Sequence, residues 1–367
     1  MKILLISNYQ AGIGGINAQV DLLHQYLNSE SGISADIFST KGNPLRRLWA
    51  LLQLLSKAAR YDVLHIHACS YWGMVPAVFG VVAGKLWRKR IVITYHGGGA
   101  DEYFAKHAAF VRRWLGRANE VIVLSGFLKE IFDQYTIPCV VIPNIVVLQP
   151  QKQRESDISS RFICIRHLEP LYNIPCILAA YKQVLSQYPN TTLDILGKGS
   201  MRAELEQYVT EHHLAGVRFI GQVPNTEIYT YLSNADIMLS ASRADNMPVS
   251  LLEAMNAGLL VIASRVGGVP YMINELEVRG DRLEVRGDEK QHSRHMPNSL
   301  ITLSPDCLNT ATGLLFESDN ADELAAKMIW ALEHPEEVHT MITNAQADVQ
   351  RYSWENVKQQ LMKVYTI

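Results

Sequence analysis

Residues 237–264 read IMLSASRADNMPVSLLEAMNAGLLVIAS, the part of the sequence that indicates the fold class most clearly. A short apolar run, residues 237–240, is followed by a polar loop, a helical pattern that begins near Pro248, and a second apolar run, residues 260–264. Proline is favoured in the first turn of a helix, and short apolar runs that alternate with helical segments are typical of βαβ units. The stretch therefore predicts one unit of a parallel sheet flanked by helices.

The same alternation extends in both directions along the chain. Strands are expected at residues 2–7, 35–39, 63–67, 91–95, 121–124, 139–142, 162–165, 192–196 and 217–220. Helices are expected at residues 16–29, 45–59, 76–87, 104–118, 127–135, 174–187, 201–212 and 225–232. The polar segment 149–160, QPQKQRESDISS, is typical of a linker. We expect an α/β protein of two doubly wound parallel-sheet domains, residues 1–148 and 161–350.

Length and composition agree with two soluble globular domains. The 367 residues are 48% hydrophobic and 19% charged, which excludes disorder or a coiled coil for the whole chain. The net charge is only −2, so no nucleic-acid partner is expected. The charge is nevertheless polarised, because residues 1–150 carry 15 Lys and Arg against 9 Asp and Glu, while the remainder carries 19 against 27.

The cysteines and apolar runs predict a cytoplasmic location. The five cysteines are scattered and never at metal-ligand spacing, which favours a reducing compartment. The first residues have too short an apolar run for a signal peptide, and residues 72–87 are too short and too interrupted for a membrane span.

A tandem repeat occupies residues 276–289, where LEVRGDR is followed directly by LEVRGDE. Two copies of seven residues are too few for a solenoid, and the following residues are rich in charge, His, Pro and Asn. We expect residues 275–310 to be a flexible insertion and not a functional element.

A glycine-rich turn, GIGGIN at residues 12–17, follows the first strand and opens a helix. Main-chain N–H groups at such a helix start favour phosphate, and a plain tight turn is the equal alternative. A dinucleotide fingerprint is excluded, because Asn17 stands where its third glycine belongs and Thr40 where its acid belongs.

A second candidate is the HGGG sequence that starts at His96, directly after an apolar strand. The carboxyl ends of parallel strands face the ligand site of an open sheet, so His96 is the strongest active-site histidine. His65 and His67 alternate along another strand without a third metal ligand nearby, and we interpret them as structural. The chain has no Asp-x-Asp motif, so no metal is expected.

The most specific candidate is the pair Asp245 and Glu253, eight residues apart in the opening stretch. Two carboxylates, one in a loop and one in a helix, can accept several sugar hydroxyl hydrogen bonds. The alternative is a helix-capping Asp and a surface Glu. The apolar neighbours of Glu253 argue against that alternative, because an idle carboxylate there would be costly.

These motifs together resemble the retaining glycosyltransferases of family 4, also called glycosyl transferases group 1. The resemblance covers nearly the whole chain except residues 149–160 and about 275–310. The motifs, in chain order, are Gly14-Gly15, LHIH (64–67), TYHG (94–97), VIVLS (121–125), VIPN (141–144), LGKG (196–199), VRFIG (217–221), the block 245–258 and Gly267-Gly268. The resemblance implies a GT-B fold, in which two Rossmann-like domains face a central cleft and a C-terminal helix, residues 351–367, crosses back to the first domain.

The resemblance also implies residue roles. Glu253 matches the glutamate that binds the donor ribose, and Asp245 matches the acid placed at the sugar hydroxyls. Arg166 matches the arginine that pairs with the donor diphosphate, and His96 matches the histidine beside the transferred sugar. The remaining donor contacts implied are Gly14, Gly15, Asn246 and Met247.

Two positions depart from the family pattern. The family usually has a lysine five to seven residues after the arginine, where this chain reads Leu171-Tyr172-Asn173. Lys198, in a glycine loop after the next strand, is a candidate replacement, and an exposed lysine without a role is the alternative. The first acid is Asp245 and not Glu, which shortens its reach by one methylene.

The resemblance thus implies a metal-independent, retaining, hexosyltransferase-type enzyme without a cofactor. It would move a sugar from a UDP- or GDP-sugar to a glycan or lipid-linked acceptor, in surface-polysaccharide or glycoconjugate synthesis. The alternatives are a non-catalytic sugar-nucleotide-binding regulator and another GT-B enzyme such as a nucleotide-sugar epimerase. Basic residues interleave with tryptophan at 46–49 and 85–90, which favours peripheral contact with the inner face of an anionic membrane; ordinary helix packing is the alternative.

Overall fold

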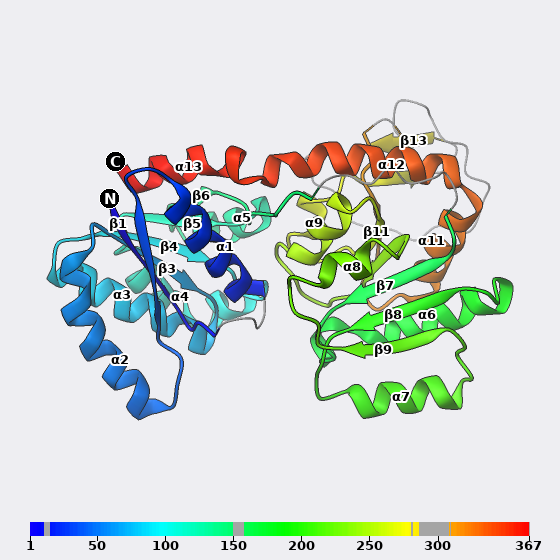
Figure 1. The fold of residues 1–367 in the computed structure, drawn as a ribbon, viewed down its shortest axis with the longest axis horizontal. Helices are drawn as coiled ribbons and strands as arrows, with labels where there is room; N and C mark the ends of the chain where they lie inside the picture. The colour runs from blue at the N-terminus through cyan, green and yellow to red at the C-terminus, as the bar shows by residue number, and fades with distance from the viewer. Residues whose placement is uncertain (11–14, 150–157, 280–281, 286–307, 309, 367) are drawn as a thin grey trace. The chain divides into compact units, whose positions relative to one another are not determined.

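The computed structural model describes residues 1–10, 15–149, 158–279, 282–285, 308 and 310–366 (Figure 1). The chain forms two compact units. The first unit contains Met1–Val147, Asp245–Val249 and Arg351–Ile367, and the second contains Leu148–Ala244 and Ser250–Gln350. The loop with Asp245 is therefore grouped with the first unit, although its neighbours in sequence belong to the second.

The described residues of the first unit form a parallel sheet in the order β2-β1-β3-β4-β5-β6. The strands are β1 Lys2–Ser7, β2 Ser34–Ser39, β3 Val63–Ala68, β4 Arg90–Tyr95, β5 Glu120–Val123 and β6 Val140–Val141. β2 lies on one side of β1, whereas β3 and the later strands follow on its other side, so the direction in which strands are added reverses between β1 and β3. Such a switch point leaves a crevice outside the carboxyl ends of its two strands, where ligands of open α/β sheets bind.

Helices connect these strands, as parallel crossovers require. They are α1 Gly15–Ser29, α2 Pro44–Lys57, α3 Val75–Leu86, α4 Ala100–Leu115 and α5 Gly126–Gln134. Two of them begin at side-chain caps: the Asn43 side chain accepts a hydrogen bond from the main-chain N–H of Arg46, and the Ser125 side chain accepts one from Leu128. Such caps satisfy N–H groups that have no partner inside the helix.

The last helix, α13 Trp354–Thr366, is also part of the first unit. Its apolar face packs into the same core as β1 and α1. The Trp354 indole N–H donates to Glu30 at 2.9 Å, and its ring stacks on Tyr26 with centroids 5.1 Å apart. Lys358 adds an ion pair with Glu30 at 2.5 Å. These contacts fasten the end of the chain to the helix that follows β1.

The described residues of the second unit form a parallel sheet in the order β14-β11-β10-β7-β8-β9. The strands are β7 Arg161–Ile165, β8 Thr192–Leu196, β9 Val217–Gly221, β10 Ile237–Ser240, β11 Leu260–Ser264 and β14 Leu314–Phe316. Numbered within the unit, the order is 3-2-1-4-5-6 from the β9 edge, the arrangement of nucleotide-binding Rossmann domains. Its switch point lies between β7 and β10.

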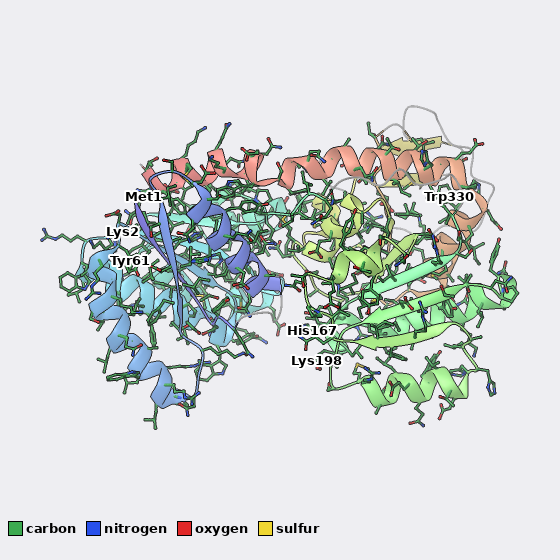
Figure 2. The ribbon with its side chains drawn as sticks, in the orientation of Figure 1. Met1, Lys2, Tyr61, His167, Lys198 and Trp330 are labelled. Atoms are coloured by element: carbon green, nitrogen blue, oxygen red, sulfur yellow. The ribbon has the colours of Figure 1, made fainter. Side chains whose placement is uncertain are left out.

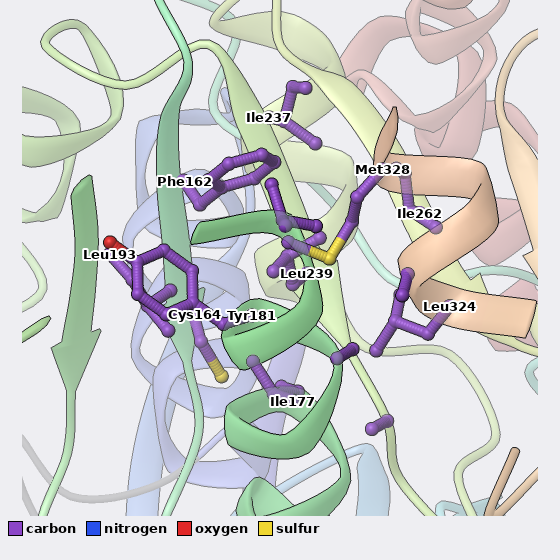
Figure 3. Close-up of a cluster of buried hydrophobic side chains, with 14 of the residues drawn as sticks. Phe162, Cys164, Ile177, Tyr181, Leu193, Ile237, Leu239, Ile262, Leu324 and Met328 are labelled. Atoms are coloured by element: carbon purple, nitrogen blue, oxygen red, sulfur yellow. The ribbon is translucent and has the colours of Figure 1, made fainter. Parts of the chain in front are cut away.

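The helices of the second unit are α6 Ile174–Gln187, α7 Arg202–Glu211, α8 Ile228–Leu232, α9 Val249–Asn256, α11 Ala321–Glu333 and α12 Pro335–Asp348. Side chains of α6, α7, α11 and α12 pack with the sheet in a continuous apolar core, part of which Figure 3 shows. Phe162 of β7, Ile237 of β10 and Tyr181 of α6 are fully buried there. At the amino ends of β7 and β10, Arg161 makes a bidentate ion pair with Asp236, with nitrogen–oxygen distances of 2.8 and 2.9 Å.

The tandem repeat forms a hairpin in its described part. β12 Leu276–Arg279 and β13 Arg282–Val285 pair antiparallel, with Leu276 opposite Val285. Residues 276–278 of the first copy therefore pair with residues 283–285 of the second. Most of the expected insertion 275–310, and residues 150–157 of the expected linker, lie outside the described residues.

The fold class predicted from the sequence is confirmed: the chain is an α/β protein with two Rossmann-like, doubly wound domains. Within the described ranges, no helix is long and apolar enough to cross a bilayer.

Candidate active site

The switch point of the second unit is occupied by Arg166, the residue directly after β7. Its guanidinium donates to the Ser240 hydroxyl at the end of β10, at 3.1 and 3.2 Å, and to the Ser250 hydroxyl in the first turn of α9, at 2.7 Å. The ring of Tyr172 lies 5.9 Å below the guanidinium. Arg166 is thus held in position between two neighbouring strands and a helix start, a place where open α/β sheets bind anionic ligands.

The loop after β8 packs closely against this arginine. Gly197 has φ +144°, and a Cβ atom there would lie 1.9 Å from the main-chain oxygen of Arg166. A Cβ on Gly199 would lie 2.2 Å from the main-chain oxygen of Leu168. Only glycine fits at these two positions, because any side chain would displace the segment that carries Arg166.

Lys198 lies between these glycines with an exposed side chain. Its main-chain oxygen accepts a hydrogen bond from the N–H of Leu168 at 3.0 Å and lies 3.3 Å from the Nδ1 atom of His167. Figure 2 labels His167 and Lys198, which lie beside each other. The lysine is therefore next to the segment that carries Arg166, while the contacts that fix the loop come from its main chain.

Glu253 lies on α9 and is partly buried. Burial raises the pKa of its carboxyl from 4.5 to about 7, and the nearby positive charge of Arg166 opposes that rise. A desolvated carboxylate beside a cation, with a pKa far from its usual value, is typical of a binding or catalytic site.

The segment in which the family lysine is absent has a structural role. Residues Pro170–Tyr172 form a short 3-10 turn that ends at Asn173, which has φ +50° and is buried. The side chain of Asn173 donates to Asp319 at 2.9 Å, and Asp319 pairs with Arg243. Arg243 also donates to the main-chain oxygen of Pro170 at 2.7 Å. This network holds Tyr172 beside Arg166.

A second group of predicted site residues lies near the switch point of the first unit. Gly15 is exposed at the start of α1, and a Cβ there would have no described atom within 4 Å. Gly14 lies outside the described residues. His96 follows β4, and its main-chain N–H donates to Ala68 at the end of β3. Its side chain is partly buried, and burial lowers its pKa to about 4.

The rings of His65 and His67 are stacked on each other, with their centroids 4.6 Å apart. Both ring nitrogens of His65 have partners, the Tyr365 hydroxyl at 2.6 Å and the Thr94 hydroxyl at 2.7 Å. The Nδ1 atom of His67 lies 2.9 Å from the Nε2 atom of His96. The structural interpretation therefore holds for His65, whereas His67 contacts the candidate active-site histidine directly.

Hydrogen bonds and close main-chain packing hold the Asp245–Val249 loop within the first unit. The Ser125 hydroxyl, after β5, donates to the side-chain oxygen of Asn246 at 2.5 Å. The side chain of Asn144 donates to the main-chain oxygen of Met247 at 3.0 Å. The main chain at Gly98 approaches so closely that a Cβ there would lie 3.1 Å from Asp245. Asn246 and Met247 are buried, and Asp245 is partly buried.

The predicted site residues thus fall into two groups. His96, Asp245, Asn246, Met247 and Gly15 lie in the first unit, and Arg166, Lys198 and Glu253 lie in the second. Sequence reasoning missed Ser240, Ser250 and Tyr172 around the arginine, and Ser125 and Asn144 around the loop. Ser125 and Asn144 were part of quoted motifs, so their sequence signal was present without a role. Within the described part of the chain, no three His, Cys, Asp or Glu side chains gather as a metal site.

Comparison with known families decides the identity. The family model of glycosyl transferases group 1 matches residues 148–292, and that of glycosyltransferase family 4 matches residues 14–149. The two matches meet near the boundary between the units and together cover most of the chain. The chain belongs to glycosyltransferase family 4.

Two curated relatives of this glycosyltransferase are named as enzymes that transfer a sugar to a phosphatidylinositol. The chain is 26% identical to the gpi3 subunit of phosphatidylinositol N-acetylglucosaminyltransferase from Schizosaccharomyces pombe over 229 residues. The aligned segment covers 61% of this chain and 42% of that protein. The chain is 26% identical over 202 residues to the phosphatidyl-myo-inositol mannosyltransferase of Mycolicibacterium smegmatis, which covers 54% and 43%. The chain spans less than half the length of these two relatives.

Among solved structures, the fold resembles that of HepE from Anabaena in complex with UDP, with a TM-score of 0.72 and 20% identity over 99% of both chains. At that identity the likeness shows the fold alone, over 99% of this chain.

Proposed function

We propose that this glycosyltransferase moves a sugar from a nucleotide diphosphate sugar, UDP- or GDP-linked, to a glycan or lipid-linked acceptor with retention of anomeric configuration. Arg166 and Glu253 bind the diphosphate and the ribose of the donor, with Lys198 as a second cation. His96 and Asp245 contact the transferred sugar, and Gly14, Gly15, Asn246 and Met247 contribute further contacts to the donor. The relatives named above fit this proposal, because their names describe sugar transfer to lipid acceptors.

One observation carries the proposal. At the switch point of the second sheet, Arg166 is fixed by Ser240 and Ser250, and Glu253 lies nearby as a partly buried carboxylate with its pKa raised to about 7. A cation aimed at a helix start is suited to phosphate, and a desolvated carboxylate is suited to a pair of hydroxyls. A nucleoside diphosphate offers both groups.

The proposed chemistry needs no enzymic nucleophile. The bond between the sugar C1 atom and the diphosphate oxygen breaks, and the bond between C1 and the acceptor oxygen forms on the same face. The acceptor proton passes to the departing diphosphate oxygen. Arg166 and the α9 N-terminus stabilise the negative charge that develops there, a contribution that is usually the largest single one.

The direct test is donor turnover. Purified protein is incubated with UDP- and GDP-sugars, and release of the nucleoside diphosphate is followed with and without glycan and lipid acceptors. We expect one nucleotide class to raise the melting temperature and to be turned over, because a bound ligand stabilises the native state. Absence of binding and turnover with every donor would contradict the proposal.

We also propose that the first unit docks on an anionic membrane through a basic and aromatic surface, defined by α2 and the C-terminal end of α3. Large apolar side chains are exposed there, with Trp49 62%, Leu48 57% and Leu86 60% exposed. Leu45, Trp49 and Leu52 share one face of α2, while Ala50 and Leu54 are buried on the other. Exposed apolar side chains of this size are costly in water and are typical of a surface that meets a lipid or a protein.

Charge favours lipid over protein. Arg46 on α2 and Lys85 and Arg88 at the end of α3 are exposed beside these apolar groups. The two helices are joined at this point by the Trp87 indole N–H, which donates to the main-chain oxygen of Leu55 at 2.5 Å. Each basic residue near an anionic surface contributes about 1 kcal/mol of attraction.

Flotation with vesicles tests the docking surface. We expect the protein to float with vesicles that contain acidic phospholipid and not with neutral vesicles. Trp49→Ser should reduce flotation, and Tyr271→Ser, at a partly exposed aromatic of the second unit, should leave it unchanged. Equal flotation of both variants, or no binding to acidic vesicles, would reject the proposal.

A further inference from the structure

The histidine pair behind the candidate active site fixes one hydrogen bond. The Nδ1 atom of His67 and the Nε2 atom of His96 are 2.9 Å apart. Burial lowers the pKa of both rings, that of His96 to about 4, so both are neutral at pH 7. Two neutral rings share a single proton in this contact, so one nitrogen donates and the other accepts.

The other nitrogen of His67 decides which ring donates. Its Nε2 atom is buried and has no hydrogen-bond partner among the described residues. If His96 donated, His67 would carry its proton on Nε2, as a buried N–H without an acceptor. If His67 donates, its own Nε2 atom carries no proton and has only a lone pair without a donor. For main-chain groups, buried N–H groups without a partner are rarer than under-satisfied acceptors, and the same desolvation argument applies to a ring nitrogen.

We propose that His67 is a positioning residue for His96: its Nδ1–H donates to the Nε2 atom of His96 and thereby fixes the other proton of His96 on Nδ1. His96 then presents an N–H donor, and not an acceptor, to the oxygen of a sugar hydroxyl or phosphate. This inference rests on the proposed function for the meaning of His96, while the direction of the hydrogen bond is independent of any substrate.

The surroundings of His67 hold the pair in place. The ring stacks on His65, which is fixed by Tyr365 of α13 and Thr94 of β4. His67 also stacks on His96 with centroids 5.2 Å apart. His67 lies on β3 and is only 5% exposed, so its side chain is confined on several sides.

The wild-type protein supplies the first test. Two-bond hydrogen–nitrogen correlation spectra of protein labelled with 15N-histidine identify the protonated nitrogen of each ring, and loss of signals in His96→Gln and His67→Leu assigns them. We expect both rings to be neutral at pH 7 with the proton on Nδ1. A His96 ring protonated on Nε2 would overturn the proposal. The spectrum requires no donor, so failure of donor turnover and failure of this inference are distinguishable.

Variants supply the second test. His67→Leu removes the donor, and we expect His96 to shift to the Nε2-protonated form and kcat to fall about tenfold or more, with a smaller change in KM for the donor. His67→Asn keeps an N–H near the position of Nδ1, so it should restore the Nδ1-protonated form of His96 and part of kcat. His65→Asn is the matched control, because His65 is also buried on β3 without a hydrogen bond to His96. A tautomer change in His65→Asn as large as in His67→Leu would overturn the proposal.

Discussion

Replacing Glu253 by glutamine should make the protein more stable and less able to bind its donor. Burial raises the pKa of this carboxyl from 4.5 to about 7, so the folded protein resists ionising it. Glutamine has nearly the same shape and no charge. The substitution therefore removes a cost that the wild-type protein bears when Glu253 is ionised.

The size and the pH window of the effect follow from the same values. The pKa of the Glu253 carboxyl is 4.5 in the unfolded chain and about 7 in the folded protein. Between pH 4.5 and pH 7 the folded protein therefore binds more protons than the unfolded chain. Stability is therefore lost as pH rises from 4.5 through 7, and the loss reaches about 3 kcal/mol above pH 8, because one pKa unit corresponds to about 1.4 kcal/mol. This is an upper value, since Glu253 is only partly buried. At pH 4.5 the advantage of glutamine should be small.

Urea unfolding of wild type and Glu253→Gln at pH 5 and pH 8 measures this difference, and calorimetry with UDP and GDP measures donor binding. Charge-assisted hydrogen bonds contribute about 1.5–3 kcal/mol, so affinity for the bound nucleotide should fall about tenfold or more. Glu275→Gln is the matched control: Glu275 is also buried in the second unit but pairs with Arg265. Breaking that pair should destabilise the protein at pH 8, the opposite sign.

Two results would refute this reasoning. One is a Glu253→Gln variant that is no more stable than wild type at pH 8, which would mean that the carboxylate is not held at a cost. The other is an unchanged nucleotide affinity, which would mean that the carboxylate does not contact the donor.

Three further predictions concern other parts of the site. Arg166→Ala should lower turnover by about 100-fold or more, because the proposed role of the Arg166 guanidinium is to stabilise the charge that develops on the diphosphate. Its circular dichroism spectrum should show an intact fold, and normal turnover would exclude Arg166 from the site. Gly197→Ala should be destabilised by roughly 1–3 kcal/mol in thermal melts, because its Cβ would meet the oxygen of Arg166 at 1.9 Å with φ at +144°; Gly15→Ala, in open space, should melt like wild type. Because the pKa of His96 is lowered to about 4, stability should be lost as pH falls from 6.5 towards 4, and His96→Gln should flatten that slope in acid unfolding; an unchanged slope would mean that His96 is not held neutral by burial.

The fold could be predicted because buried parallel strands are short, nearly continuous apolar runs. The expected strand at 2–7 is β1, and the expected helix at 45–59 is α2 with bounds at Pro44 and Lys57. The expected strand 139–142 shortens to β6, Val140–Val141, at the edge of the sheet, where one side has no partner strand among the described residues. Apolar runs give strand positions without strand order, and the order is what creates the two switch points.

The candidate site could be predicted only in part, because its contacts join residues far apart in sequence. Arg166 and Glu253 were found from their motifs, whereas Ser240 and Ser250, which fix Arg166, gave no signal of their own. His67 was interpreted as structural because no third metal ligand lies nearby in sequence. Its actual partner, His96, comes from the neighbouring strand, and strand pairing brings the two together.

The two groups of site residues respond to pH in opposite directions. In the first unit, burial holds His96 neutral, with its pKa lowered to about 4, so acid favours unfolding below pH 6.5. In the second unit, burial makes Glu253 costly to ionise, so rising pH through 7 works against folding. Neither cost serves the fold, since apolar residues would fill the same space without it. If both groups contact the donor, as we propose, each unit keeps a group that lowers its stability because that group is needed for a ligand.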